Sequence, residues 1–341
     1  MAPLWAAPAP CWVVRHHAPS AVHSVAFANA GAYLVAGDAK GRVSVTSMTD
    51  YRPRLFWDAH KDTVLRADAW GGYLVTVEVN ALNYCAYDMA LRDAASLTGW
   101  LAVPHTLESA WIDIYALPQR RRVRDSVGRL AVLGRGMERP PIVMGVRLTL
   151  LGSTLYLVAG YEDGSVQAWT MTAGDDGSLS PPELLWSHRP HTESVMALCL
   201  TPDERTVVSV GADQRVVQIA LAENAQPQTT TMQRPGHACV AVRSDARTMA
   251  VGGWDGGVRV FSLPAMDLLA TLAYHKDGVN GVAYIRRGNV HTLALPADDS
   301  SDEEGPALPR HLLAAGSKDG RISLWDVPFT KDDAMPALRA P

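Results

Sequence analysis

Histidine–aspartate pairs are the residues of this sequence whose types and spacing could do chemistry. In each pair the histidine precedes an apolar, strand-like run, and the aspartate stands in a turn that follows. A histidine oriented by a carboxylate is half of a Ser–His–Asp triad, so one interpretation of the pairs is catalytic. Three pairs fit the pattern: His191 with Asp213, His237 with Asp255, and His275 with Asp319.

Repetition favours a structural interpretation of these pairs. The pair recurs from unit to unit, and no serine or cysteine nucleophile accompanies it in a strained turn. An imidazole can instead donate to the turn carboxylate and tie the loop to the rest of its unit. We therefore interpret the pairs as structural locks, and predict no catalytic residues, cofactor or metal site. His17 and His60 are similarly placed but lack the aspartate; Lys40 stands at the first turn.

Repeated hairpins must position these pairs. Leu155–Trp169 reads LYLVAGYEDGSVQAW, two apolar runs around a turn, and close variants appear at Leu34–Thr46, Val207–Ile219, Met249–Phe261 and Leu312–Trp325. Gly164, Gly256 and Gly320 follow the turn aspartate, where a tight turn needs a positive φ. A hairpin repeated along a chain is typical of a β-propeller or a solenoid.

The spacing of the units predicts a seven-bladed all-β propeller with an incomplete second blade. The step from Thr46 to Tyr115 exceeds one repeat of about 40–45 residues but is shorter than two. After Val77 the chain passes directly to Val79–Tyr87, which we expect to be the first strand of the third unit. The last unit lacks a fourth strand, and the predicted strand Trp12–Arg15 precedes the first unit without a hairpin partner of its own. We expect the N-terminal strand to pair with the last blade and close the ring.

Composition limits the class of protein. The 341 residues are 48% hydrophobic and 19% charged, as in a globular chain. A net charge of −4 argues against a general nucleic-acid binder. The N-terminus reads MAPLWAAPAPCWVV, without a basic region and with prolines in its apolar run, so it resembles neither a signal peptide nor a membrane span. The cysteines form no CxxC pair, and we expect reduced, mostly buried thiols: Cys11, Cys85, Cys199 and Cys239.

Residues 1–330 are expected to form one propeller, with a short tail at 331–341. A shift to acidic, Pro-containing sequence at 296–309 predicts a disordered insertion in the last unit. Ser300 and Ser301 have acids three residues on, as in sites for an acid-directed kinase; the alternative is an unmodified solvated loop.

Two further surface features have alternative interpretations. The basic stretch Arg120–Arg124 could grip phosphate or an acidic partner, but we favour an outer strand kept soluble by charge. Four aromatic residues near loops could anchor an interface, although we favour packing within blades: Trp111, Tyr161, Trp254 and Tyr274.

The hairpins GYEDGSVQAW, GSKDGRISLWD and GGWDGGVRVF look like WD-repeat blades. Val79–Met89 (VNALNYCAYDM), Trp100–Pro118 (WLAVPHTLESAWIDIYALP) and the N-terminal stretch from Val13 give a narrower resemblance over nearly the whole chain. They resemble the fungal ASTRA-associated protein 1 family and its animal relative, the G-protein beta-subunit-like protein one. In that family the second blade is completed before the VNALNYCA strand, so this chain departs there, through a true deletion or a gene-model error.

The resemblance implies a non-catalytic WD-repeat scaffold within an ASTRA-like nuclear complex. Such a complex is linked to chromatin remodelling and to the maturation and stability of phosphatidylinositol-3-kinase-related kinases. The implied partners are other subunits of the complex, large helical-repeat proteins and kinase-maturation chaperones; no direct nucleic acid, membrane or small-molecule substrate is expected. The implied location is the nucleus, with the cytoplasm left open as a second one.

Two other functions are alternatives to this one. Another interaction propeller, such as a G-protein beta-like subunit or a ubiquitin-ligase substrate receptor, would need a long N-terminal coiled coil or an adaptor-binding motif, and neither is convincing here. A propeller enzyme would need clustered acids, a metal set or an activated nucleophile, whereas the sequence offers only the repeated His–Asp pairs.

Overall fold

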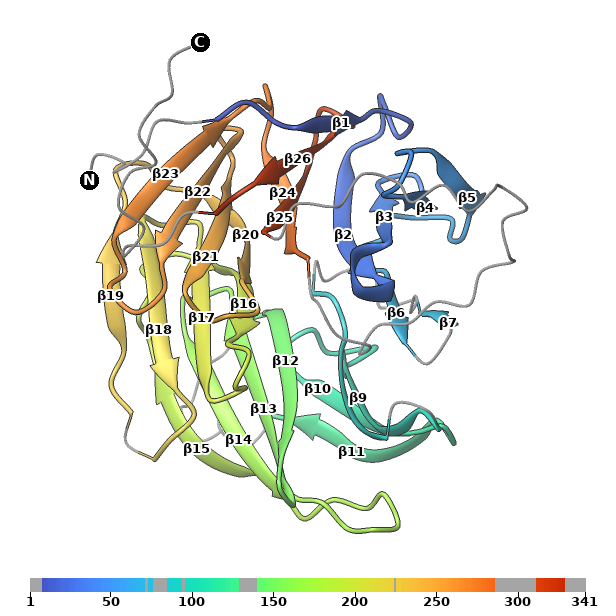
Figure 1. The fold of residues 1–341 in the computed structure, drawn as a ribbon. Helices are drawn as coiled ribbons and strands as arrows, with labels where there is room; N and C mark the ends of the chain where they lie inside the picture. Colours follow the sequence, from blue (N-terminus) through green and yellow to red (C-terminus); the bar gives the residue numbers. More distant parts are fainter. Residues whose placement is uncertain are drawn as a thin grey trace.

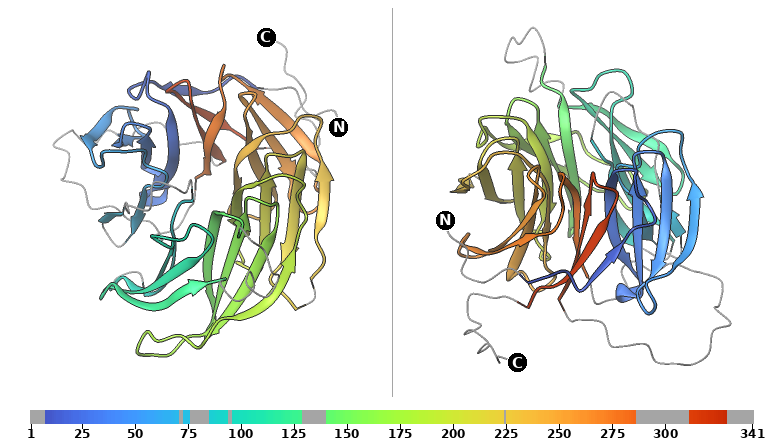
Figure 2. Two further views of the ribbon diagram at one scale, coloured as in Figure 1. Left: turned by 180° about the vertical axis from the view of Figure 1, so that it is seen from behind. Right: turned by 90° about the horizontal axis from the view of Figure 1, so that it is seen from above.

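The computed structural model describes residues 8–70, 73–75, 85–93, 96–128, 140–223, 225–285 and 311–328. Within these ranges the protein is all-β, with one short 3-10 turn at Asn29–Gly31 (η1). The strands form six four-stranded antiparallel sheets, which we call blades A to F, and one two-stranded sheet. The blades stand around a common centre (Figure 1), and the views from behind and from above show the same arrangement (Figure 2).

Blades A to E are runs of consecutive strands, ordered from the centre outward. Blade A is β2 (Val22–Ala28), β3 (Tyr33–Asp38), β4 (Arg42–Ser47) and β5 (Pro53–Asp58). Blade B is β8 (Asp88–Asp93), β9 (Thr98–Pro104), β10 (Ile112–Leu117) and β11 (Arg121–Val127). Blade C is β12 (Val143–Leu151), β13 (Thr154–Tyr161), β14 (Val166–Thr172) and β15 (Glu183–His188). Blade D is β16 (Val195–Leu200), β17 (Thr206–Gly211), β18 (Arg215–Ala220) and β19 (Gln228–Thr231); blade E is β20 (His237–Val242), β21 (Thr248–Gly253), β22 (Gly257–Ser262) and β23 (Leu268–Ala273). Blade F is β24 (Val279–Tyr284), β25 (Leu312–Ser317), β26 (Ile322–Asp326) and, from the other end of the chain, β1 (Trp12–Val14).

The N-terminal strand closes blade F. Strand β1 pairs antiparallel with β26 in the register Trp12↔Leu324 to Val14↔Ile322. The side chain of Val14 is buried with residues of blades A and F in one apolar cluster. Chain ends far apart in sequence are thereby joined in one sheet, and β26 gains a partner along its outer edge.

The predicted seven blades are wrong, because the described residues contain six. The second unit supplies only β6 (Asp68–Trp70) and β7 (Tyr73–Val75), a small hairpin that lies between blades A and B (Figure 1). Asp58 ends β5 and Asp88 begins β8, which leaves less chain than one repeat needs. The inner strand of blade B also begins at Asp88, after the predicted Val79–Tyr87 stretch, whose residues 79–84 lie outside the described ranges.

The core lies between neighbouring blades. The inner strands contact one another in the order β2, β24, β20, β16, β12 and β8, and β6 contacts β2. Apolar clusters therefore join successive blades, such as Val158 and Ala168 of blade C with Val195 and Val217 of blade D. Burying the apolar side chains of sheet on sheet is the main driving force for this architecture.

Candidate interaction surface

The lock of blade D brings His191 and Asp213 together, as their spacing predicts. His191 Nδ1 donates to Asp213 Oδ1 at 3.0 Å, and its Nε2 lies 2.9 Å from the hydroxyl of Ser209, which donates to it. Burial alone would raise the pKa of Asp213. The hydrogen bonds from His191 and from the N–H groups of Arg215 and Thr192 outweigh it and lower the pKa to about 2. The loop before β16 is thus tied to the hairpin turn of its own blade.

Blade F holds the predicted pair of His275 and Asp319 in the same way. His275 Nδ1 donates to Asp319 Oδ2 at 3.0 Å, and the Ser323 hydroxyl donates to Nε2 at 2.8 Å. The indole N–H of Trp325 donates to the same hydroxyl at 2.7 Å, so the chain of hydrogen bonds runs from tryptophan to aspartate. A connected buried network of this kind rigidifies the blade that the N-terminal strand closes.

Blade A contains a lock that the sequence prediction missed. His17 Nδ1 donates to Asp38 Oδ2 at 3.1 Å and its Nε2 accepts from Ser44 Oγ at 2.8 Å. The expectation that His17 lacks an aspartate was wrong. Asp38 ends β3, two residues before Lys40. Its carboxylate accepts hydrogen bonds from the N–H groups of Lys40 and Arg42, and so takes the role of the turn aspartate in blades D and F.

The predicted pair of His237 and Asp255 is not formed. His237 is the first residue of β20, in the register position that Val195 and Val279 occupy in neighbouring blades, and not in the preceding loop. Both of its ring nitrogens are buried without a hydrogen-bond partner. Asp255 is held instead by Arg259, with Nη1–Oδ1 3.0 Å and Nη2–Oδ2 2.5 Å. Blade E therefore has no lock, although its turn aspartate is present.

The locks have the atom connectivity of a Ser–His–Asp triad, and sequence reasoning missed their serines. Ser323 follows Asp319 by four residues, a signal that was present in the sequence. Ser44, Ser209 and Ser323 are all 0% exposed and lie within paired strands. Water and substrate are therefore excluded from the hydroxyls, and the arrangement can stabilise blades but cannot present a nucleophile.

An arginine of the second unit joins the small hairpin to blades B and C. Arg66 donates to Asp68 at 2.9 Å, to Asp88 at 2.5 Å and to the carbonyl of Tyr87 at 3.1 Å. The other Asp88 oxygen accepts from the N–H of Leu148 in β12 at 2.8 Å. One guanidinium thus holds together the part of the ring in which the described residues form only a two-stranded sheet.

Replacing Arg66 by methionine should lower the free energy of unfolding by about 2–3 kcal/mol, because the largely buried carboxylates of Asp68 and Asp88 would lose the positive charge that they share. Urea unfolding followed by tryptophan fluorescence measures this change. The matched change Arg54→Met removes a solvent-accessible pair with Asp50 and should cost less than about 1 kcal/mol. Equal losses in the two variants would contradict the bridging role of Arg66.

The outer strand of blade A exposes apolar side chains toward the incomplete unit. Leu55 and Trp57 pair across the sheet with Val45 and Val43, on the face that packs against Val64, Ala67 and Ala69. The inner valines are buried, but Trp57 is 38% and Leu55 39% exposed. A two-stranded hairpin is too narrow to cover the outermost strand of its neighbour. Exposed apolar surface of this kind is typical of protein–protein contact.

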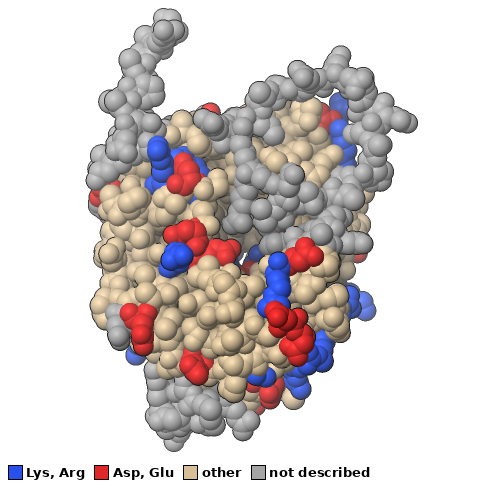
Figure 3. Space-filling view, turned by 60° about the horizontal axis from the view of Figure 1, so that its bottom comes forward, with Lys and Arg blue, Asp and Glu red and all other residues tan. Residues whose placement is uncertain are grey.

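The other surface predictions have mixed outcomes. The basic stretch lies largely in β11, the outermost strand of blade B, as the favoured interpretation expects. Tyr161 is buried, but Trp254 is 49% exposed, against the expectation that it packs within a blade. Ser300, Ser301 and the insertion at 296–309 lie outside the described residues, as does the tail at 331–341. Lys, Arg, Asp and Glu are interspersed on the face shown in Figure 3.

The described ranges contain no group of three or more His, Cys, Asp and Glu side chains placed to hold a metal ion. Among the same residues no helix has the length and apolar character that crossing a bilayer requires. The four cysteines are free: Cys85 and Cys239 are buried, Cys199 is half-buried and Cys11 is exposed. Burial raises the pKa of the Cys85 and Cys239 thiols to about 12, so both stay protonated at neutral pH.

Comparison with known proteins gives a repeat type and several relatives that match most of this chain. The family model "WD domain, G-beta repeat" matches residues 182–218, 228–262 and 266–326, in blades C to F. ASTRA-associated protein 1 of Verticillium alfalfae is 29% identical over 388 residues, covering 94% of this chain and 93% of that protein. The protein of that name from Schizosaccharomyces pombe is 23% identical over 402 residues, with 93% and 98% covered.

A mouse protein is also similar. Guanine nucleotide-binding protein subunit beta-like protein 1 of Mus musculus is 27% identical over 255 residues, which cover 74% of this chain and 67% of the mouse protein. These relatives confirm the resemblance that the sequence motifs indicated. The fungal similarities extend over almost the full length of both chains, so they include the non-repeating parts as well as the WD repeats.

Proposed function

We propose that this chain, a WD-repeat propeller that matches the ASTRA-associated protein 1 family along nearly its whole length, is the scaffold subunit of an ASTRA-like nuclear complex. The observation that carries the proposal is this near-complete coverage by fungal proteins of that name. The complex would act in chromatin remodelling and in the maturation of phosphatidylinositol-3-kinase-related kinases. Its partners would be large helical-repeat proteins and kinase-maturation chaperones.

The structure of the described blades suits a binding subunit better than an enzyme. The histidines and serines that could form a triad are buried in the locks of the described blades. Rigid blades present loops and outer strands to the solvent, and binding residues concentrate in such positions. The partly exposed side chains of Leu55 and Trp57 in blade A add an apolar rim that a partner could cover.

Affinity purification of the tagged protein from its native cells, at moderate salt, tests the proposal. Mass spectrometry should recover helical-repeat maturation factors together with a phosphatidylinositol-3-kinase-related kinase, and depletion of the protein should lower the amount of that kinase. Recovery of none of these proteins, from cells in which the tagged chain is folded and abundant, would overturn the assignment to this complex.

A matched pair of variants tests whether the rim of blade A takes part. We expect Trp57→Arg to lower the recovery of partners about tenfold, because a charge would replace the apolar contact of a central interface residue. Leu184→Arg makes the same type of change on β15 of blade C, where Leu184 is also exposed, and should leave recovery unchanged. Equal recovery with both variants would place the interface elsewhere on the protein.

A further inference from the structure

Blade E differs from its neighbours at the place where a lock should stand. In blades D and F the loop histidine lies four residues before the inner strand and fills the space between the turn aspartate and a serine. Counting back in the same way from β20 gives Gln233, next to Met232. Arg259 follows Asp255 by four residues, as Ser323 follows Asp319. Blade E thus has glutamine and arginine where blade F has histidine and serine.

The backbone supports this alignment of blade E with blade F. The N–H of Trp254 donates to the carbonyl of Gly236 at 2.9 Å, as the N–H of Lys318 donates to that of Gly278. These two carbonyls belong to the residues just before β20 and β24. The loops are therefore anchored alike, and only their side chains differ.

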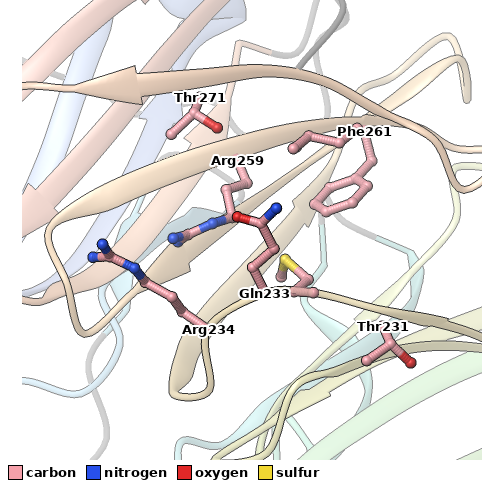
Figure 4. A pocket seen from close by; sticks show the side chains of 8 residues that line it. Thr231, Gln233, Arg234, Arg259, Phe261 and Thr271 are labelled. Atoms are coloured by element: carbon pink, nitrogen blue, oxygen red, sulfur yellow. The ribbon is translucent and has the colours of Figure 1, made fainter. Parts of the chain in front are cut away.

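A cavity of about 180 Å³ lies at the altered lock. The ring of Phe261 lies at one side of it, and the polar side chains of Gln233, Arg234 and Arg259 gather at the other (Figure 4). The lining residues are Thr231, Met232, Gln233, Arg234, Arg259, Phe261, Leu268 and Thr271. A water molecule takes about 30 Å³ of liquid, so the space suits one amino-acid side chain.

Positive charge exceeds negative charge at this cavity. Its lining includes two arginines and no aspartate or glutamate. Arg259 is paired with Asp255 just outside, and Arg234 lies 3.5 Å from the same carboxylate. Two guanidinium groups therefore share one carboxylate, and the side chain of Arg234 is 72% exposed. The adjoining hollow, which shares Thr231, includes Glu193, Asp213 and Arg215, so its lining carries one more negative group than positive groups.

Hydrogen bonds to Gln214 hold the loop that carries Arg234 in place without a ligand. The N–H of Met232 donates to the Gln214 carbonyl at 2.7 Å, and the Gln214 amide donates to the Gln233 carbonyl at 3.3 Å. The half-exposed Trp254 packs over Gly236, where a Cβ would meet its ring at 2.4 Å. A fixed loop loses little entropy on binding, and an exposed indole beside it offers a contact for apolar groups.

We propose that this cavity, the altered lock of blade E, binds an acidic peptide segment of a partner protein. A glutamate or aspartate side chain enters the cavity, and its carboxylate accepts hydrogen bonds from Arg234 and Gln233. The aliphatic part of the side chain contacts Met232 and Phe261, and a neighbouring apolar residue packs on Trp254. Blade E lacks the stabilising lock that blades A, D and F contain, and such local departures from a fold's pattern are typical of functional sites. The site is independent of which complex contains the protein.

Fluorescence polarisation with the purified full chain tests the site. The probe is a fluorescein-labelled hexapeptide of alternating leucine and glutamate, and the matched control peptide has glutamine in place of glutamate. We expect the glutamate peptide to bind at least about tenfold more tightly, because each charge-assisted hydrogen bond is worth about that factor. The difference should shrink as salt rises, since the arginines are solvent-accessible. Equal binding of both peptides, or none up to millimolar concentration, would overturn the proposal.

Two variants assign the binding to the cavity. Arg234→Gln removes an exposed charge without disturbing the core, and should weaken binding of the glutamate peptide about tenfold. Arg259→Ser restores the residue type of blade F and should weaken it similarly. Arg205→Gln is the matched control, an exposed arginine in the loop between β16 and β17. Circular dichroism melts establish folding, and an equal effect of Arg205→Gln and Arg234→Gln would show unspecific charge attraction and overturn the site.

Discussion

The His191→Ala variant should lose about 3–4 kcal/mol of unfolding free energy. The imidazole is buried and bonds to both Asp213 and Ser209, so its removal leaves a carboxylate and a hydroxyl without their partner inside the protein. A hydrogen bond to a charged group is worth about 1.5–3 kcal/mol, and an unsatisfied buried hydroxyl costs about 1–3 kcal/mol. Urea unfolding followed by circular dichroism at pH 7 measures the loss.

The neighbouring change Glu193→Ala is the control, because Glu193 is an exposed residue of the same loop. It should alter the unfolding free energy by less than about 0.5 kcal/mol. The two variants should also differ in pH dependence. The Asp213 pKa is lowered from 3.8 to about 2, so the lock contributes fully above pH 4 and its contribution is lost as the pH falls toward 2. A loss below about 1 kcal/mol in His191→Ala would contradict the structural role of the lock.

The His237→Val variant should be more stable than the natural protein, and increasingly so in acid. His237 is 0% exposed, its ring nitrogens have no partner, and neighbouring blades have valine at the same register position. Burial, and then the nearby Arg259 charge, lower the pKa of His237 to about 4. An unsatisfied buried polar group costs about 1–3 kcal/mol, so we expect a gain of about that size at pH 7.

The sign of the pH effect follows from the lowered pKa. In the unfolded chain the imidazole binds a proton near its ordinary pKa of 6.5, whereas in the folded protein it stays neutral down to about 4. The natural protein therefore loses stability as the pH falls from 6.5 to 4, by up to about 3 kcal/mol from this group. Between pH 7 and pH 4.5 the unfolding free energy should fall less in the variant than in the natural protein. Parallel pH profiles would contradict the assignment.

Local sequence patterns predicted what depends on nearby residues. Alternation of apolar residues and a turn with Asp and Gly define each hairpin, and Gly164, Gly256 and Gly320 have the positive φ expected of them. The locks of blades D and F were predictable because loop, turn and strand belong to one repeat and meet wherever that repeat folds. Pairing of the N-terminal strand with blade F followed from counting strands, since an unpaired edge strand seeks a partner.

Only the tertiary structure decided three points, each of which depends on register or on packing between units. The described residues form six blades, because a stretch shorter than one repeat cannot supply four paired strands, and Arg66 bridges the space instead. His237 falls in a strand and not in a loop. The pairing of β20 with β21 decides where β20 begins, and a shift of a few residues there changes the surroundings of the His237 side chain. The cavity beside Arg259 depends on side-chain volumes from two blades, which no local pattern contains. Local spacing thus determined the repeating hairpin, and long-range packing determined how many of them close the ring and where a repeated site is altered.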